Sequence, residues 1–128
     1  MALIRSPLAM GLLAGRITAE TQLPKDDVRS KEEDYNDWFT DGRMTPRWAR
    51  RLEAIRECLQ SGGRSLPQGA LGWLWARHPR SFPIPGMRTP GQVADLCGAL
   101  EHGPLPSETM AEIERLVDRP EEGEPRAR

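Results

Sequence analysis

Apolar residues recur at helical spacing in the second half of the chain, and this pattern predicts helices over residues 45–59 and 65–78. Thr45 and Ser65 stand at the positions where a side-chain oxygen caps a helix. Two glycines at residues 62 and 63 end the first helix. The core-facing positions of the two helices are Trp48, Leu52, Ile55, Leu59, Leu66, Ala70, Leu71, Leu74 and Trp75.

Two more helices and two short strands complete the pattern. One helix begins at Thr89 or Pro90, and Ser107 is expected to cap a last helix that runs to about Val117. The positions that we expect to be buried in these helices are Val93, Leu96, Cys97, Leu100, Met110, Ile113 and Leu116 or Val117. Residues 82–84 are typical of a short buried strand, and residues 3–4 of the end of another.

The rest of the chain is typical of loops. Pro7 favours an extended conformation or a turn at Ser6, and two glycines at residues 11 and 15 favour a loop over a long helix. Residues 18–41 are polar and acidic, and the acidic clusters in them are typical of a solvated face. We expect Trp38 and Phe39 to anchor this loop in the core. Residues 118–128 have the composition of a disordered tail.

Composition narrows the class of protein. The chain has 128 residues, enough for one domain, and its net charge of −1 predicts neither a nucleic-acid nor a membrane-surface partner. No apolar run is as long as a membrane span, and a signal peptide is disfavoured because Pro7 interrupts the apolar start. Cys58 and Cys97 have no disulfide or metal-ligand spacing. They are typical of buried thiols in a reducing compartment and predict a cytoplasmic protein without a metal.

Candidate chemistry lies in the turn that follows residues 82–84. Gly86 lets the backbone approach a ligand closely, and Arg88 stands beside the predicted start of a helix. A glycine turn, an arginine and a helix N-terminus together favour an anion, typically a phosphate. The alternative is a strand–helix turn whose arginine is only solvated.

The same turn carries a resemblance to a known family. The run Ile84-Pro85-Gly86-Met87-Arg88-Thr89, followed by Gln92, Asp95 and Gly98-Ala99-Leu100, resembles the last strand and helix of aldo/keto reductases. Nearer the start, the family's seventh-strand segment is matched by Ser6, Pro7, Leu8, Gly11, Leu13 and Gly15. The helix over 65–78, with Trp73, and the closing helix also resemble family segments, so the likeness runs from about Leu3 to Val117.

The resemblance implies a fold, a cofactor and a set of site residues. It implies an α/β protein that forms part of a TIM (β/α)8 barrel, predominantly helical with about two short parallel strands, over residues 1–117. It implies NADP(H) as cofactor, held by Ser6, Leu8, Gly86, Met87, Arg88, Thr89 and Gln92. The chain departs from the family at Met87, where some members have Lys, and at Leu96, where an Asn often contacts adenine.

The family's catalytic residues are a Tyr supported by Asp, Lys and His, and they lie on earlier strands than those matched here. The one tyrosine, Tyr35, stands in the acidic loop outside the family's motif, so no catalytic residue is predicted. Because two strands cannot close a barrel, we expect apolar helix faces, with Trp48 and Trp73 among them, to be exposed. The chain would then be a fragment, or it would pair with a polypeptide that supplies the missing N-terminal half.

Three hypotheses about function follow. The first is the NADP(H)-binding C-terminal part of an enzyme that reduces aldehydes or ketones by hydride transfer, inactive alone. The second is a non-enzymatic helical protein that binds a partner through apolar helix faces. The third is a truncated gene product.

Overall fold

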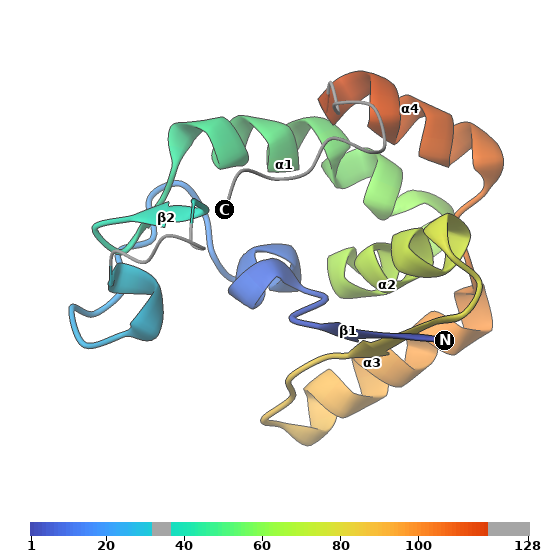
Figure 1. Ribbon diagram of the computed structural model, residues 1–128, viewed down its shortest axis with the longest axis horizontal. Coiled ribbons are helices and arrows are strands. Elements are labelled where there is room, and N and C mark those ends of the chain that lie inside the picture. Colours follow the sequence, from blue (N-terminus) through green and yellow to red (C-terminus); the bar gives the residue numbers. More distant parts are fainter. Residues whose placement is uncertain (32–36, 118–128) are drawn as a thin grey trace.

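A computed structural model describes residues 1–31 and 37–117, which form four α-helices and two small two-stranded sheets (Figure 1). The strands are β1 (Ala2–Arg5), β2 (Phe39–Thr40), β3 (Arg43–Met44) and β4 (Ser81–Ile84). The α-helices are α1 (Pro46–Leu59), α2 (Leu66–Arg77), α3 (Pro90–His102) and α4 (Ser107–Val117). Short 3-10 segments cover Ala9–Ala14, Val28–Ser30 and Ser61–Gly63. The predicted tail and Tyr35 lie outside the described residues.

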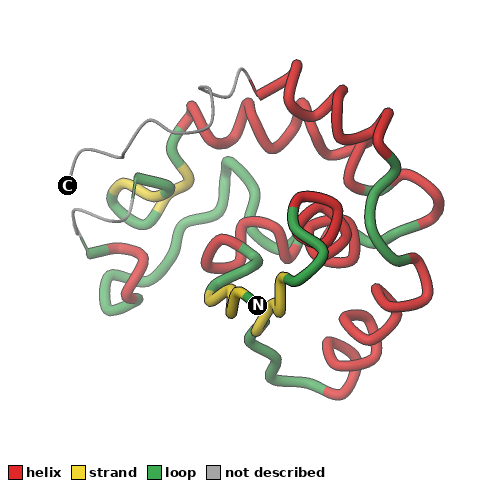
Figure 2. Tube along the Cα trace, turned by 45° about the vertical axis from the view of Figure 1, so that its right-hand side comes forward, coloured by secondary structure: helices red, strands yellow, loops and turns green. Residues whose placement is uncertain are grey.

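β1 and β4 pair in parallel although residues 6–80 separate them in the sequence (Figure 2). Ala2 lies opposite Ser81 and Arg5 opposite Ile84, and the N–H of Ala2 donates to the carbonyl of Arg80 at 3.0 Å. Parallel strands need a long crossover, and here it contains α1 and α2. The prediction of a mostly helical α/β fold with two short parallel strands is therefore confirmed. No closed barrel forms within the described residues.

A second, antiparallel pair was not predicted. β2 and β3 form a hairpin through Asp41 and Gly42, which both have positive φ, 49° and 73°. An Asp-Gly pair is the strongest short-range hairpin signal, because both central residues of a type I′ turn need positive φ. The hairpin buries Phe39 and Met44 in the core. Trp38 packs against that core, so the predicted anchoring of the loop is confirmed.

The helix boundaries follow the sequence closely, while two caps differ. Ser65 and Thr89 each accept a hydrogen bond from the backbone N–H three residues on, as predicted for caps. Thr45 makes no cap bond, because its hydroxyl donates to the carbonyl of Asp37 at 3.3 Å. Ser107 is the first residue of α4 and not its cap, since the carbonyl of Pro106 accepts the N–H of Met110.

The main core lies between α1, α2, α4 and the loops before α1. Its buried residues are Leu12, Ile17, Leu23, Phe39, Met44, Leu52, Leu59, Leu66, Leu105 and Ile113. A smaller cluster of Leu71, Leu96 and Ala99 joins α2 to α3. Trp48 and Trp73 pack against the main core and are only partly exposed, so their predicted exposure is wrong. α4 packs on α1 and α2 and shelters these helices.

The apolar surface left open belongs to the sheet. Leu3, Phe82 and Ile84 point to one face and are 63%, 59% and 53% exposed, so the prediction of a buried strand is wrong. The alternate residues Ala2 and Ile4 point to the other face and are half-buried. Parallel strands are normally covered on both faces, and within the described residues α2 packs on β4 with no element opposite it.

Burial in α3 also differs from the prediction. Leu96 is buried as expected, whereas Val93, Cys97 and Leu100 are exposed and Ala99 is completely buried. The reason is that α3 packs closely against α2 with its narrow Leu96–Ala99 face. The prediction of two buried thiols is therefore wrong for Cys97; Cys58 is half-buried, and burial raises the pKa of its thiol.

Candidate functional site

The two turns named by the sequence leave the sheet at the same edge. Arg5 lies opposite Ile84, so Ser6 and Pro85 are the first residues beyond the carboxyl ends of two adjacent parallel strands. In open parallel sheets, ligands bind outside this edge. The structure thus brings the segment with Ser6 and Leu8 next to the turn with Gly86 and Arg88.

The chain turns sharply after β1. Ser6 has φ of 52°, so of the two conformations expected before Pro7, extended or turn, the structure has the turn. The N–H of Ala9 donates to the carbonyl of Ser6 at 3.0 Å and closes the turn. Leu8 packs against the small cluster between α2 and α3. Its side chain is therefore an anchor. Its carbonyl accepts the N–H groups of Gly11 and Leu13, at 2.9 and 3.2 Å, so the backbone N–H is the group of Leu8 that a ligand could contact.

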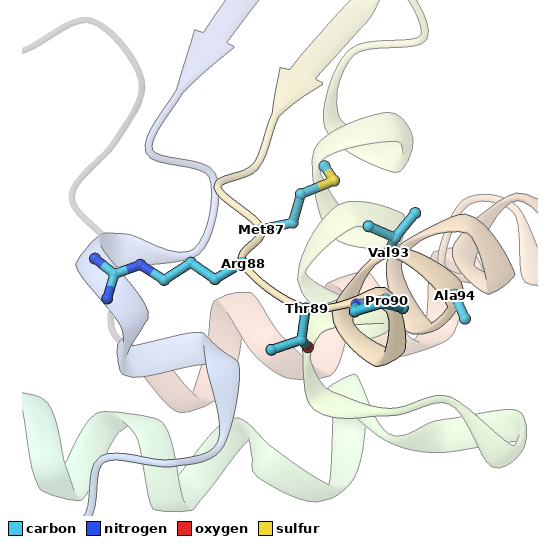
Figure 3. Close-up of a pocket in the computed structure, with 6 residues that line it drawn as sticks. All are labelled: Met87, Arg88, Thr89, Pro90, Val93 and Ala94. Carbon is cyan, nitrogen blue, oxygen red and sulfur yellow. The ribbon is translucent and has the colours of Figure 1, made fainter.

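The turn after β4 borders an open groove of about 560 Å³ at the start of α3 (Figure 3). Its lining consists of Met87, Arg88, Thr89, Pro90, Val93 and Ala94. In Figure 3 the Arg88 side chain extends away from Val93 and Ala94, toward the segment that follows β1. Within the described residues no carboxylate oxygen lies within 4.0 Å of its guanidinium. The groove therefore has a cation at one end and an apolar surface at the other.

Side chains already occupy most of the backbone donors at the start of α3. Gln92 Oε1 accepts the N–H of Arg88 at 2.7 Å and that of Thr89 at 3.2 Å, and the hydroxyl of Thr89 accepts the N–H of Gln92 at 3.2 Å. Pro90 has no N–H. Among the described residues, only Gly91 has a first-turn N–H without a hydrogen bond. An anion here would depend mainly on the Arg88 side chain.

The ion pair between Arg29 and Asp27, called the clamp below, holds the loop that comes before the hairpin. Arg29 donates to Asp27 through Nε at 2.8 Å and Nη2 at 2.6 Å, and its Nη1 donates to the carbonyl of Met10 at 3.1 Å. Its guanidinium also lies over the ring of Phe39, 5.9 Å from the centroid. These contacts fasten the loop to the segment after β1.

The clamp makes stability depend on pH. Hydrogen bonds from the side chain and backbone of Arg29 lower the pKa of Asp27 from 3.8 to about 2, and the charge of Arg88 adds a smaller effect. A carboxyl whose pKa is lower in the folded state stabilises the fold above its unfolded pKa. That contribution is lost as the pH falls from about 4 to about 2.

We expect Asp27→Asn to remove this part of the acid sensitivity. Thermal unfolding curves measured between pH 2 and pH 6 should show a smaller loss of Tm below pH 4 in the variant than in the wild type. Asp26→Asn is the matched control, because Asp26 is exposed and forms no ion pair among the described residues. An equal loss of Tm below pH 4 in the wild type, Asp27→Asn and Asp26→Asn would contradict the contribution of the clamp to stability.

The family's adenine-contacting position, Leu96, and its neighbour Asp95 both contribute to the contact between α2 and α3. Leu96 is 8% exposed and packs toward α2, so its side chain is not available to a ligand. Asp95 accepts hydrogen bonds from Gln68 Nε2 through its carbonyl at 2.8 Å and through Oδ1 at 3.1 Å. This pair links α2 to α3 and is structural.

Other kinds of site find no support in the described residues. No group of three His, Cys, Asp or Glu side chains within 1–31 and 37–117 is arranged to hold a metal ion. The helices of the same ranges are too short or too polar to cross a membrane. The turns at the edge of the parallel sheet remain the candidate site.

Fold and site together define an α/β protein with two turns at one edge of a parallel sheet and, at a helix start, an arginine that forms no ion pair with any described residue. The chain belongs to the aldo/keto reductase family, whose model matches residues 2–118. This family consists of oxidoreductases that generally use nicotinamide cofactors. No curated protein and no solved structure gives a significant match to the chain.

Proposed function

We propose that this chain is the NADP(H)-binding C-terminal part of an aldo/keto reductase barrel. The observation that carries the proposal is Arg88, a guanidinium without a carboxylate partner among the described residues, beside an open groove at the carboxyl edge of β1 and β4. A guanidinium can grip a phosphate through two parallel hydrogen bonds. The ligand that fits is a nicotinamide dinucleotide with a 2′-phosphate. The other residues proposed to contact it are Ser6, Leu8, Gly86, Met87, Thr89 and Gln92.

The proposal includes no catalysis by the isolated chain. The full enzyme would transfer hydride to an aldehyde or ketone, with a tyrosine as proton donor. We assign that role to no residue here, because Tyr35 lies outside the family's motif and outside the described residues. Oxidation of NADPH in the presence of a broad aldehyde substrate, measured at 340 nm, would contradict this part of the proposal.

Thermal unfolding with cofactor tests the binding. We expect saturating NADPH to raise the Tm of the purified chain more than NADH does. A ligand that binds only the folded state adds about 2.7 kcal/mol of stability at a hundredfold excess over Kd. Equal curves with NADPH, NADH and no ligand would overturn the proposal.

The open face of the sheet favours a second candidate, a protein that binds a polypeptide partner. Leu3, Phe82 and Ile84 form an apolar surface that would be covered in a complete barrel. This function does not need Arg88. A loss of cofactor binding in Arg88→Ala with unchanged partner binding would therefore separate the two functions.

A further inference from the structure

The first half of α1 carries three arginines that form no ion pair with any described residue. Arg47 and Arg50 are exposed, and Arg51 is half-buried. No carboxylate oxygen in the described part of the chain lies within 4.0 Å of their guanidinium groups, whereas Arg56 in the same helix pairs with Glu53 at 3.3 Å. These three side chains are called the arginine face below.

The ring of Trp48 holds two of the three arginines in place. The guanidinium groups of Arg51 and Arg47 lie over it, 5.1 and 6.0 Å from the centroid. Because stacking orders these long side chains, less conformational entropy remains to be lost when an anion binds. With two guanidinium groups over it and the core against it, the ring has little surface left for a nucleobase. The arginine face therefore fits carboxylates better than a nucleic acid.

The side of α1 that carries these arginines is also the side that α4 covers farther along the helix. Arg47, Arg51 and Cys58 stand at spacings of four and seven residues, which places them in one stripe. Burial, and after it the charge of Glu112, raises the pKa of the Cys58 thiol, so the middle of α4 lies beside the last turn of α1. Figure 1 shows that α4 runs back along α1. The end of α4 therefore points along the stripe toward the arginine face.

Beyond α4 the sequence continues with three glutamates at positions 121, 122 and 124, called the acidic run below. Both helices rise by about 1.5 Å per residue, so Val117 is level with about Glu53, and Arg51 and Arg47 lie about 3 and 9 Å farther on. Position 121 is four residues after Val117, a length that an extended chain spans with up to about 13 Å. The acidic run is thus long enough to reach the arginine face.

We propose that the acidic run of this chain binds the arginine face of α1 and covers it. Exposed ion pairs are individually weak, but a short tether raises the effective concentration of the run to about the millimolar range. A separate acidic molecule must reach a comparable concentration to displace it. The contact also places negative charge at the positive end of the α1 dipole, where the first turn has no acidic residue of its own. It is independent of the groove beside Arg88.

A spin label at position 123 tests the contact in the full-length chain. Gly123→Cys is labelled in a Cys97→Ser background, because Cys97 is exposed, and the same background without the new cysteine shows any labelling of the half-buried Cys58. We expect the amide NMR signals of residues 47–51 to broaden severalfold more than those of α3. The broadening should fall by at least about half in 0.5 M salt, which screens exposed charges.

Two sets of substitutions and a matched control identify the charges. Neutralising the acidic run with Glu121→Gln, Glu122→Gln and Glu124→Gln should remove the broadening, and Arg47→Gln with Arg51→Gln should do the same. Arg16→Gln with Arg80→Gln removes the same charge at two exposed positions elsewhere and should leave it unchanged. Absence of broadening in the otherwise wild-type chain, or broadening that persists in both neutralised chains, would overturn the proposal.

Binding of a hexa-aspartate peptide then shows whether the acidic run is the occupant. The peptide should bind the chain with the neutralised run at least about threefold more tightly than the wild type, because in the wild type the run competes for the same arginines. Equal affinities would mean that the arginine face is open to a separate partner. A single-stranded oligonucleotide that removes the broadening at a lower concentration than the peptide would assign the face to nucleic acid. Either result would overturn the proposal.

Discussion

Gly69→Ala should destabilise the chain by about 3 kcal/mol, at the upper end of what overpacking usually costs. A Cβ at Gly69 would lie 1.9 Å from the carbonyl oxygen of Leu59 and 2.5 Å from its carbonyl carbon. Both atoms belong to the backbone at the end of α1, so no side-chain rotation can relieve the contact. Leu59 is only 2% exposed, and a shift of α1 would disturb the main core. The free energy of unfolding from urea titration measures the effect.

The expected change in the free energy of unfolding has the opposite sign at an ordinary helix position, where replacing Gly by Ala adds about 1 kcal/mol of stability. Gly91→Ala provides the matched control, because its Cβ would meet nothing closer than Thr89 Oγ1 at 4.0 Å. We expect this variant to be as stable as the wild type or slightly more stable. A Gly69→Ala variant as stable as the Gly91→Ala control would contradict the close approach of α1 and α2.

The sequence predicts the helices of this chain well because their signals are local. Spacing of apolar residues and capping residues place α1 to α4 to within a residue or two. Gly69 shows the limit of local signals, because in the sequence it is only a glycine inside a predicted helix. The contact that makes it necessary involves Leu59, ten residues away and across the turn between two helices.

Burial was harder to predict because it depends on the partners of each element. Phe82 and Ile84 have the composition of a buried strand, yet no described element covers their face of the sheet. Trp48 and Trp73 were expected to be exposed for want of a barrel, but both pack against the main core, and the guanidinium of Arg51 lies over the ring of Trp48. In both cases the sequence identified the apolar face correctly, but it could not show whether other parts of the chain would cover that face.

Arg64 shows a contact that no sequence pattern indicates. This residue is 9% exposed, and its guanidinium donates to the carbonyls of Ser61, His102 and Pro104 at 2.9, 3.1 and 3.4 Å. It joins the turn between α1 and α2 to the link between α3 and α4. In the sequence, an arginine that follows two glycines is typical of a solvated loop residue. Only the structure shows that the carbonyls of His102 and Pro104 lie beside it.

The sequence named the two segments of the candidate site, but it gave little information about their hydrogen-bond donors. The pairing of β1 with β4 brings the motif around Arg88 and the segment after Ser6 to one edge of the sheet. The sequence also indicated a helix N-terminus with free N–H groups, but Gln92 and Thr89 already occupy most of them. Binding of an anion therefore depends more on the Arg88 side chain than the sequence suggested.

Arg88→Ala should weaken NADPH binding by about tenfold to a hundredfold and leave NADH binding nearly unchanged, because only the 2′-phosphate needs this guanidinium. Kd values from isothermal titration at fixed ionic strength measure the effect. Arg80→Ala is the matched control, since Arg80 is exposed and precedes the amino end of β4. An equal loss in both variants would indicate a diffuse positive potential. No loss in either would contradict the phosphate site.

Arg88→Lys separates charge from geometry at the same position. Lysine keeps the positive charge, but it cannot form two parallel hydrogen bonds from one planar group. With most of the backbone donors of the first turn of α3 already bonded, little else in the turn can compensate for the lost bond. We therefore expect an NADPH affinity between those of the wild type and Arg88→Ala. Wild-type affinity in Arg88→Lys would mean that the phosphate is held by charge alone, and that the planar fork of the guanidinium has no part in recognising it.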